Sequence, residues 1–124
     1  MAELLYKELT GQIRQAAFDV HSYFGNGFLE QVYENALAYK LRQIPLKWEV
    51  QKPLKVYFEE NVIVGEYFAD LIVEEKVIVE LKVAKRIEKI HLAQLNNYLK
   101  ATKHKLGLLI NFGDEKLQMK RVIL

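Results

Sequence analysis

Three ionisable side chains interrupt a stretch of the sequence that otherwise has the composition of a β-sheet. Nine residues, most of them apolar, separate Asp70 from Glu80, and Lys82 follows Glu80 after a single leucine. Carboxylate oxygens are ligands that Mg²⁺ and Mn²⁺ prefer. A divalent ion lowers the pKa of a bound water and stabilises charge on phosphoryl oxygens, and a neighbouring ammonium can orient that water. These residue types therefore predict a metal site suited to the hydrolysis of phosphodiester bonds.

The spacing determines whether Asp70 and Glu80 can meet. Side chains alternate between the two faces of a strand, and the pattern predicts a hairpin of two strands, Val62–Val73 and Val77–Val83. A two-residue turn would place Asp70 opposite an apolar side chain, whereas a three-residue loop, Glu74-Glu75-Lys76, places it opposite Glu80. We predict the three-residue register. One face is then polar and carries Glu66, Asp70, Glu80 and Lys82. The other face is apolar, and its residues in the first strand are Tyr67, Ala69, Leu71 and Val73.

A simpler interpretation of these charges is a salt bridge between the two strands. Lys82 could pair with Asp70 or Glu80 on the surface, and such exposed pairs contribute at most about 1 kcal/mol. Two carboxylates about 5 Å apart repel each other, however, unless a cation lies between them. The residues alone leave both interpretations open.

The helical pattern adds a third carboxylate to the candidate site. Apolar residues recur at steps of three and four over residues 3–24, 28–42 and 87–101, which predicts three helices. In the second of these, Glu30 lies in the same row as Leu37 and Leu41. A carboxylate inside a buried face needs a partner or a metal. At the edge of that face it would only favour the first turn through the helix dipole. Glu30 is therefore a candidate site residue, and the structural role is the alternative.

Gln94 lies inside the apolar arc of the third predicted helix. An amide without a partner is costly there, so its side chain needs a polar environment. We favour an orientation toward the polar face of the hairpin over a hydrogen bond to the backbone. His91 lies in the same arc and is interpreted as a packing or solvent-edge residue rather than a ligand.

The remaining apolar runs complete the predicted fold. They predict short strands at Leu46–Val50, Leu54–Phe58, Leu106–Phe112 and Leu117–Ile123. The expected order is α-α-β-β-β-β-α-β-β within a single domain over residues 1–124. The predicted class is α/β (α+β), with a mixed β-sheet flanked by helices. Exposed edge strands could pair between copies of the chain, so a homo-oligomer is an open alternative.

Composition excludes several classes of protein. The absence of cysteine excludes disulfides and thiolate metal sites. No run approaches the roughly 20 apolar residues of a membrane span, and the N-terminus lacks the pattern of a signal peptide. We therefore expect a cytoplasmic protein with no membrane partner.

Basic residues dominate the segment that follows the hairpin. From Lys82 to Lys105 the only acid is Glu88. A local excess of positive charge attracts phosphate, so Lys85, Arg86 and Lys89 are candidate contacts to nucleic acid. The alternative is an ordinary solvated helix face.

The combined motifs resemble a known superfamily. Asp70 followed by Glu80-Leu-Lys82 resembles the signature of the PD-(D/E)XK nucleases, with Ala69 where that signature has a proline. The segment Gly27-Phe-Leu-Glu30-Gln-Val-Tyr33 resembles the motif that names the GxxExxY proteins, a bacterial and archaeal group placed in that superfamily. The resemblance continues through Ala93–Ala101 and Gly107–Gly113 and covers essentially the whole chain.

The resemblance implies a restriction-endonuclease-like core and a catalytic set within it. It implies that Asp70, Glu80 and Glu30 hold Mg²⁺ or Mn²⁺, that Lys82 assists the attacking water, and that Gln94 completes the site. The expected catalytic residues are Asp70, Glu80, Lys82, Glu30 and Gln94. The expected nucleic-acid contacts are Lys85, Arg86, Lys89 and Tyr98.

Two hypotheses from different functional classes arise from these residues. The first is a Mg²⁺-dependent nuclease, with DNA favoured over RNA as the substrate. The second is a non-catalytic module that keeps the nuclease fold and binds nucleic acid or protein, and the short chain of 124 residues is its support. A purely structural protein is disfavoured, because a scaffold needs no acidic pair facing a lysine.

Overall fold

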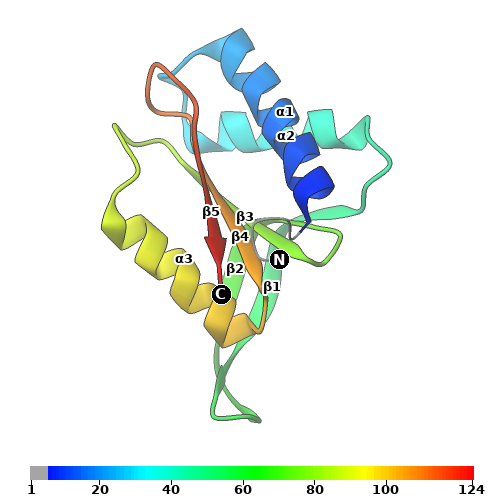
Figure 1. The fold of residues 1–124 in the computed structure, drawn as a ribbon, viewed down its shortest axis with the longest axis vertical. Helices are drawn as coiled ribbons and strands as arrows, with labels where there is room; N and C mark the ends of the chain where they lie inside the picture. The colour runs from blue at the N-terminus through cyan, green and yellow to red at the C-terminus, as the bar shows by residue number, and fades with distance from the viewer. Residues whose placement is uncertain (1–5) are drawn as a thin grey trace.

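Figure 1 shows the computed structural model of the protein, which describes residues 6–124. Two helices come first, α1 (Lys7–Phe24) and α2 (Glu30–Arg42). Three strands follow, β1 (Trp48–Phe58), β2 (Val62–Val73) and β3 (Val77–Lys82). After them come helix α3 (Lys89–Thr102) and the strands β4 (Leu106–Asn111) and β5 (Gln118–Ile123). The predicted class, a mixed sheet flanked by helices, is confirmed.

The five strands form one sheet in the order β1-β2-β3-β4-β5. β3 and β4 are parallel, and the other neighbours are antiparallel. Parallel neighbours cannot be joined by a tight hairpin, so the chain crosses between them through α3. An interior strand covered on both faces needs a continuous apolar sequence, and β4 is buried along its whole length.

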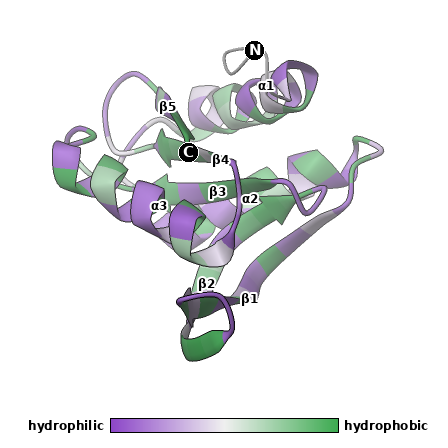
Figure 2. Ribbon diagram, turned by 60° about the horizontal axis from the view of Figure 1, so that its bottom comes forward, coloured by the Kyte–Doolittle hydropathy of each residue, from purple (hydrophilic) through white to green (hydrophobic). Residues whose placement is uncertain are grey.

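The sheet separates two hydrophobic cores. One lies under α1 and α2 and contains side chains such as Ile13 and Leu37, and the other lies under α3 and contains Leu95 and Leu99. Figure 2 shows α1 and α3 on opposite sides of the sheet. Full burial of each such side chain contributes roughly 1.5–3 kcal/mol to the stability of the fold. Because both cores contain such residues, the central strands are packed against helices on both faces. No helix in the described range is long and apolar enough to cross a membrane.

The observed elements agree with the predicted ones within a few residues, with one difference. The strands expected over Leu46–Val50 and Leu54–Phe58 are parts of the single strand β1. Pro53 is tolerated inside it because β1 is at the edge of the sheet. The predicted beginning of the first helix at Glu3 lies outside the described residues.

The register of the β2–β3 hairpin is the predicted one. Val73 pairs with Val77 and Leu71 pairs with Val79, so the loop between them contains three residues. Asp70 therefore lies opposite Glu80. This register is the geometric condition for the candidate site.

The prediction of a single apolar face on β2 is wrong. Tyr67 and Ala69 belong to the core under α3, whereas Leu71 and Val73 belong to the core under α1 and α2. The alternation of side chains therefore shifts near Asp70. The facing residue of β1, Gln51, has a φ of 49° and takes no part in the β1–β2 pairing. A local irregularity shared by two strands thus lies beside the first predicted site residue.

Candidate active site

The site forms where the β2–β3 ladder is interrupted. Asp70 and Glu80 face each other, but their side chains take the place of the backbone pairing. The Asp70 N–H donates to Glu80 Oε2 at 3.0 Å, and the Leu81 N–H donates to Asp70 Oδ2 at 2.9 Å. Each carboxylate thus replaces a backbone carbonyl as the acceptor, which fixes both side chains within the sheet. The second oxygen of each carboxylate is not used in this exchange.

Burial and mutual repulsion make these two carboxylates unfavourable in their charged forms. Burial and the charge of Asp70 raise the pKa of Glu80 to about 7, against the opposing effects of hydrogen bonding and of Lys82. Burial is also the largest cause of the raised pKa of Asp70, and the charge of Glu34 adds to it. Two half-buried carboxylates that face each other across the strands carry a negative charge that a bound cation would relieve.

These pKa shifts make the folding stability depend on pH. Glu80 holds its proton more tightly in the folded than in the unfolded protein, so stability falls as the pH rises from about 4.5 to about 7. We expect the free energy of unfolding of the ion-free protein to be about 2 kcal/mol lower at pH 7.5 than at pH 5, and Glu80→Gln to remove most of this slope. Urea denaturation in EDTA at both pH values measures the difference. A wild-type stability that stays flat or rises over this range would contradict the described electrostatics.

Lys82 and α3 form the wall of a cavity beside the carboxylates. The cavity has a volume of about 240 Å³, and Glu80, Lys82 and Gln94 are among the residues that line it. Gln94 is exposed and faces the polar side of the hairpin, the orientation favoured from the sequence. Within residues 6–124 no ion pair joins Lys82 to Asp70 or Glu80, so the simple salt bridge between strands is not formed.

Two stacked tyrosines form another part of the cavity. The rings of Tyr67 and Tyr98 lie 3.8 Å apart between centroids, with an angle of 9° between their planes. The Tyr67 hydroxyl is buried and lies close to the Glu80 carboxylate. Burial and the nearby charge of Glu80 raise the pKa of Tyr67, so the hydroxyl stays protonated. The protonated hydroxyl is therefore placed to donate to Glu80 on the wall of the candidate site.

Helix α2 brings two carboxylates toward Asp70. Glu30 is exposed in the first turn, and partial burial and the charge of Asp70 raise its pKa, while the charge of Lys82 lowers it. Glu30 therefore lies at the edge of the buried row, within electrostatic range of the site. One turn later, Glu34 is only 6% exposed, and its Oε1 accepts from Gln51 Nε2 at 2.9 Å. The sequence analysis missed Glu34, although it lies in the same helical row as Glu30.

The beginning of α2 is fixed by Gly27 and Tyr33. Gly27 has a φ of 112°, a conformation that residues with a Cβ rarely adopt. Tyr33 is fully buried, and its hydroxyl donates to the Gly25 carbonyl at 2.6 Å and accepts from the Phe28 N–H at 3.3 Å. Its ring stacks on Phe112 with 4.6 Å between centroids. These contacts tie α2 to the end of α1 and to the residue after β4, and so hold the α2 carboxylates near the sheet.

The segment from the end of β3 to the first turn of α3 carries the predicted basic contacts. Lys85, Arg86 and Lys89 are all exposed. His91 has a structural part in this segment, because its Nδ1 accepts from the Glu88 N–H at 3.0 Å and completes a capping box at the beginning of α3. Its ring also lines the cavity, and the interpretation as a packing or solvent-edge residue did not foresee the capping role.

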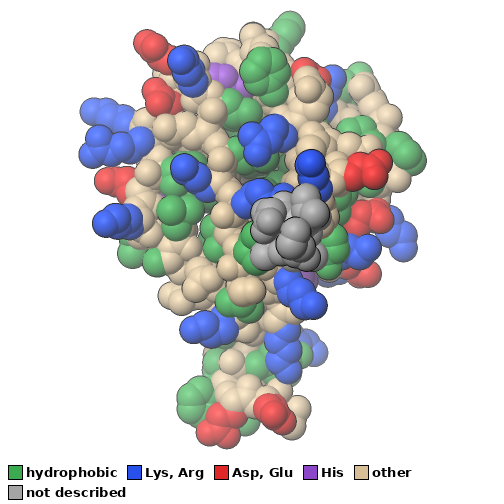
Figure 3. Space-filling model, in the orientation of Figure 1, with side chains coloured by type: hydrophobic (Ala, Val, Ile, Leu, Met, Phe, Trp, Pro, Cys, Tyr) green, Lys and Arg blue, Asp and Glu red, His purple; other side chains and the backbone are tan. Residues whose placement is uncertain are grey.

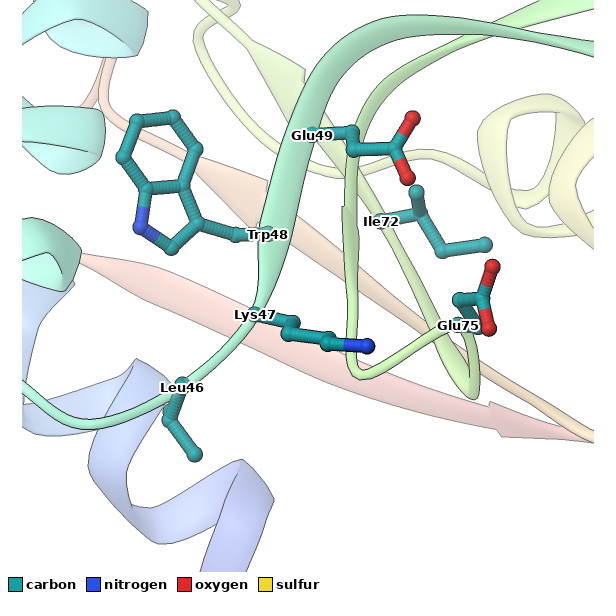
Figure 4. A pocket seen from close by; sticks show the side chains of 6 residues that line it. All are labelled: Leu46, Lys47, Trp48, Glu49, Ile72 and Glu75. Carbon is teal, nitrogen blue, oxygen red and sulfur yellow. The ribbon is translucent and has the colours of Figure 1, made fainter.

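A second pocket, shown in Figure 4, lies apart from these residues. It has a volume of about 380 Å³ and is lined by Leu46, Lys47, Trp48, Glu49, Ile72 and Glu75. The Trp48 ring points away from the Glu49 and Glu75 carboxylates in Figure 4. Both carboxylates are paired with Lys52 Nζ, at 3.2 and 3.3 Å. None of the predicted site residues lines this pocket, so we do not include it in the candidate active site.

The donor chemistry of the site fits a hard divalent ion, although a complete ligand set is not assembled. Asp70, Glu80 and Glu34 supply carboxylate oxygens, which suit Mg²⁺ and Mn²⁺. Within residues 6–124 no group of three or more His, Cys, Asp or Glu side chains is arranged to hold an ion. Glu34 is held instead by the Gln51 amide. The structure therefore brings Asp70 and Glu80 together, with Glu34 linked to Asp70 through the Gln51 amide.

Comparisons with known proteins place the chain in a family. A family model described as the PD-(D/E)XK nuclease superfamily matches residues 7–122. A solved structure titled "Crystal structure of SSO0001" aligns with a TM-score of 0.57 and 16% identity, over 97% of this chain and 61% of that one. At this identity the likeness shows the fold alone, and the chain spans less than two thirds of that protein. No curated protein matches the chain. Since the family model covers nearly all of the sequence, the chain belongs to the PD-(D/E)XK nuclease superfamily and has its restriction-endonuclease-like fold.

Proposed function

We propose that this protein is a nuclease that depends on Mg²⁺ or Mn²⁺ and hydrolyses phosphodiester bonds of nucleic acid. The observation that carries the proposal is the contact of Asp70 and Glu80 across two strands, next to a cavity lined by Lys82. Membership of the nuclease superfamily supports nucleic acid as the substrate. The raised pKa of Glu80 supports a functional role, because strongly shifted carboxylates in a cleft are candidates for chemistry.

Each residue has a part in this chemistry. Asp70 and Glu80 would hold the ion, with Glu30 or Glu34 as a further carboxylate ligand. The bound ion would acidify a water and stabilise charge on the phosphoryl oxygens. Lys82 would donate a hydrogen bond to the attacking water or to a phosphoryl oxygen, where a fixed positive charge is most effective. Gln94 lines the same cavity, and its amide would orient the water or the phosphate.

The surface around the cavity suits a nucleic acid strand. The exposed Lys85, Arg86 and Lys89 would contact phosphates, and we favour DNA over RNA as the ligand. Figure 3 shows Lys and Arg side chains spread over one face, with Asp and Glu side chains along its flanks and at the tip of the β1–β2 hairpin. Tyr98 is 37% exposed and is backed by Tyr67, so its ring can stack on an unpaired base.

A non-catalytic binding module with the same fold is the second candidate function. The observation in its favour is that Asp70 and Glu80 are already satisfied by backbone N–H groups, and that the described residues hold no assembled three-ligand cluster. Such a module would bind nucleic acid or protein without turnover. Binding that does not respond to divalent ions distinguishes it from the nuclease.

Within the superfamily, we infer membership of the GxxExxY group. The motif residues have distinct physical roles that support the inference. Gly27 provides a positive φ, Tyr33 holds the beginning of α2, and Glu30 lies within electrostatic range of Asp70. A cytoplasmic location and assembly into homo-oligomers stay predictions.

A cleavage assay tests the proposed function. We expect the wild-type protein to cut DNA with Mg²⁺ or Mn²⁺ and not with EDTA. We expect Lys82→Met to slow cleavage by about 10²-fold while the protein still binds Mn²⁺. Lys100→Met, an exposed lysine on α3, is the matched control and should cut as wild type does. Equal rates for wild type and Lys82→Met would point to a contaminating nuclease. No cleavage of any DNA or RNA substrate would favour the binding module.

A further inference from the structure

Gln51 has an unusual backbone conformation beside the candidate site. It lies in β1 opposite Asp70, between the pairs Val50–Leu71 and Lys52–Ala69. Its φ of 49° is in the left-handed region, which is strained for a residue other than glycine. Such strain persists where other contacts hold the residue. For Gln51 the side chain makes those contacts.

The Gln51 amide joins two carboxylates from different elements. Its Nε2 donates to Glu34 Oε1 at 2.9 Å and to Asp70 Oδ1 at 3.2 Å. Both acceptors are carboxylate oxygens, so the NH₂ group rather than the carbonyl must face them. Within residues 6–124 neither Glu34 nor Asp70 has an ion pair. Gln31 Nε2 also donates to Glu34 Oε2 at 2.8 Å, and the Leu81 N–H donates to Asp70 Oδ2 at 2.9 Å. The Gln51 amide differs from these donors because it contacts both carboxylates, so its partial positive charge lies between them.

We propose that Gln51 is a positioning residue that holds the Glu34 and Asp70 carboxylates together and competes with a divalent cation for their oxygens. This inference rests on the proposed function and concerns the ion that function needs. An amide NH₂ offsets two full negative charges less well than a divalent ion does. The Gln51 residue is exposed, so its side chain can swing into solvent as an ion enters. Gln51 thus keeps the two carboxylates together without the ion and lowers the affinity for it.

The two effects of Gln51 are thermodynamically linked. Whatever the amide contributes to the stability of the ion-free protein is lost when the ion displaces it, and this loss weakens ion binding by the same factor. Gln51→Met keeps the length of the side chain and removes its donor. We expect this variant to unfold at a lower temperature than wild type in EDTA, and to bind Mn²⁺ about fivefold more tightly. At saturating Mn²⁺ the two proteins should unfold at the same temperature.

Isothermal titration with Mn²⁺ and thermal unfolding, in EDTA and at saturating Mn²⁺, test the inference. Gln15→Met is the matched control, because Gln15 Nε2 donates to an exposed carboxylate, Asp19 Oδ1 at 2.9 Å, on α1. It should leave the Mn²⁺ affinity unchanged. Gln51→Glu places a third carboxylate in the same position, and we expect a larger loss of ion-free stability and a larger gain in affinity. If Gln51→Met does not fold in EDTA, its recovery by Mn²⁺ supports the inference.

Three results would overturn it. Weaker Mn²⁺ binding by Gln51→Met would make Gln51 a ligand instead of a competitor. Unchanged affinity in both Gln51 variants would remove it from the ion site while leaving the proposed nuclease in place. A wild-type protein that binds no Mn²⁺ at all would overturn the proposed function together with this inference, so the two failures are distinguishable.

Discussion

Glu80→Gln is expected to lower the rate of DNA cleavage by at least about 10³-fold, equivalent to about 4 kcal/mol of transition-state stabilisation. Glutamine has nearly the shape of glutamate, and its side-chain oxygen can still accept from the Asp70 N–H, which lies 3.0 Å from Glu80 Oε2. The exchange of hydrogen bonds between β2 and β3 is therefore kept. The substitution removes the negative charge that would hold the ion, and little else.

The same substitution is expected to stabilise the ion-free protein at neutral pH. Because burial and Asp70 raise the pKa of Glu80 to about 7, the ionised side chain opposes folding above that pH. A neutral amide removes this opposition. A loss of activity together with a gain in stability is typical of a residue kept for chemistry rather than for folding. Cleavage kinetics with Mg²⁺ and urea denaturation in EDTA at pH 7.5 measure the two effects.

Glu66→Gln is the matched control for this prediction. Glu66 is an exposed carboxylate on β2, four residues before Asp70. Removal of its charge should leave both the cleavage rate and the free energy of unfolding close to their wild-type values. If Glu80→Gln kept more than about a tenth of the wild-type rate, Glu80 would have to be removed from the catalytic set.

The register of the β2–β3 hairpin could be predicted from the sequence because side-chain parity leaves few alternatives. A slip of one residue would move every side chain of β3 to the other face, so only a loop of three residues brings Asp70 to Glu80. The strand β4 could be predicted from the sequence as well. A strand buried on both faces needs a run of apolar residues, and that run is visible without knowledge of its neighbours.

The contacts between elements could not be predicted in the same way. Glu30 and Glu34 share a helical row, and which of them is buried depends on how Tyr33 docks α2 against the rest of the protein. Gln51 has no local signature, since its contacts come from α2 and β2 together. The shift in alternation near Asp70 likewise depends on two neighbouring strands. Periodicity describes one element at a time, whereas the contacts of Glu34 and Gln51 depend on α2, β1 and β2 together.

Asn111→Ala is expected to lower the free energy of unfolding by about 4 kcal/mol, and the unfolding temperature by about 15 °C. Asn111 is completely buried at the end of β4. Its Oδ1 accepts from the N–H groups of Ala84 and Gly113 at 2.9 and 3.0 Å, and its Nδ2 donates to the Ala84 carbonyl at 2.8 Å and to Gln118 Oε1 at 2.9 Å. Alanine would leave these groups without partners, at about 1–3 kcal/mol for each one that stays buried.

This network also holds the segment that carries the site. Ala84 is two residues after Lys82, and the Phe112 N–H donates to the Lys82 carbonyl at 2.9 Å. The chain segments approach closely here, since a Cβ added to Gly113 would lie 2.4 Å from the Ala84 backbone. We therefore expect Asn111→Ala, assayed well below its unfolding temperature, to cleave DNA more slowly than wild type, because Lys82 loses its anchor.

Asn97→Ala, an exposed asparagine on α3, should change neither quantity and serves as the control. Urea denaturation and cleavage rates measured on both variants separate the two effects. A loss of stability below about 1 kcal/mol in Asn111→Ala would mean that water replaces its hydrogen bonds. The end of β4 would then not be what positions Lys82, and the rigidity of the site would have to come from the Asp70–Glu80 exchange alone.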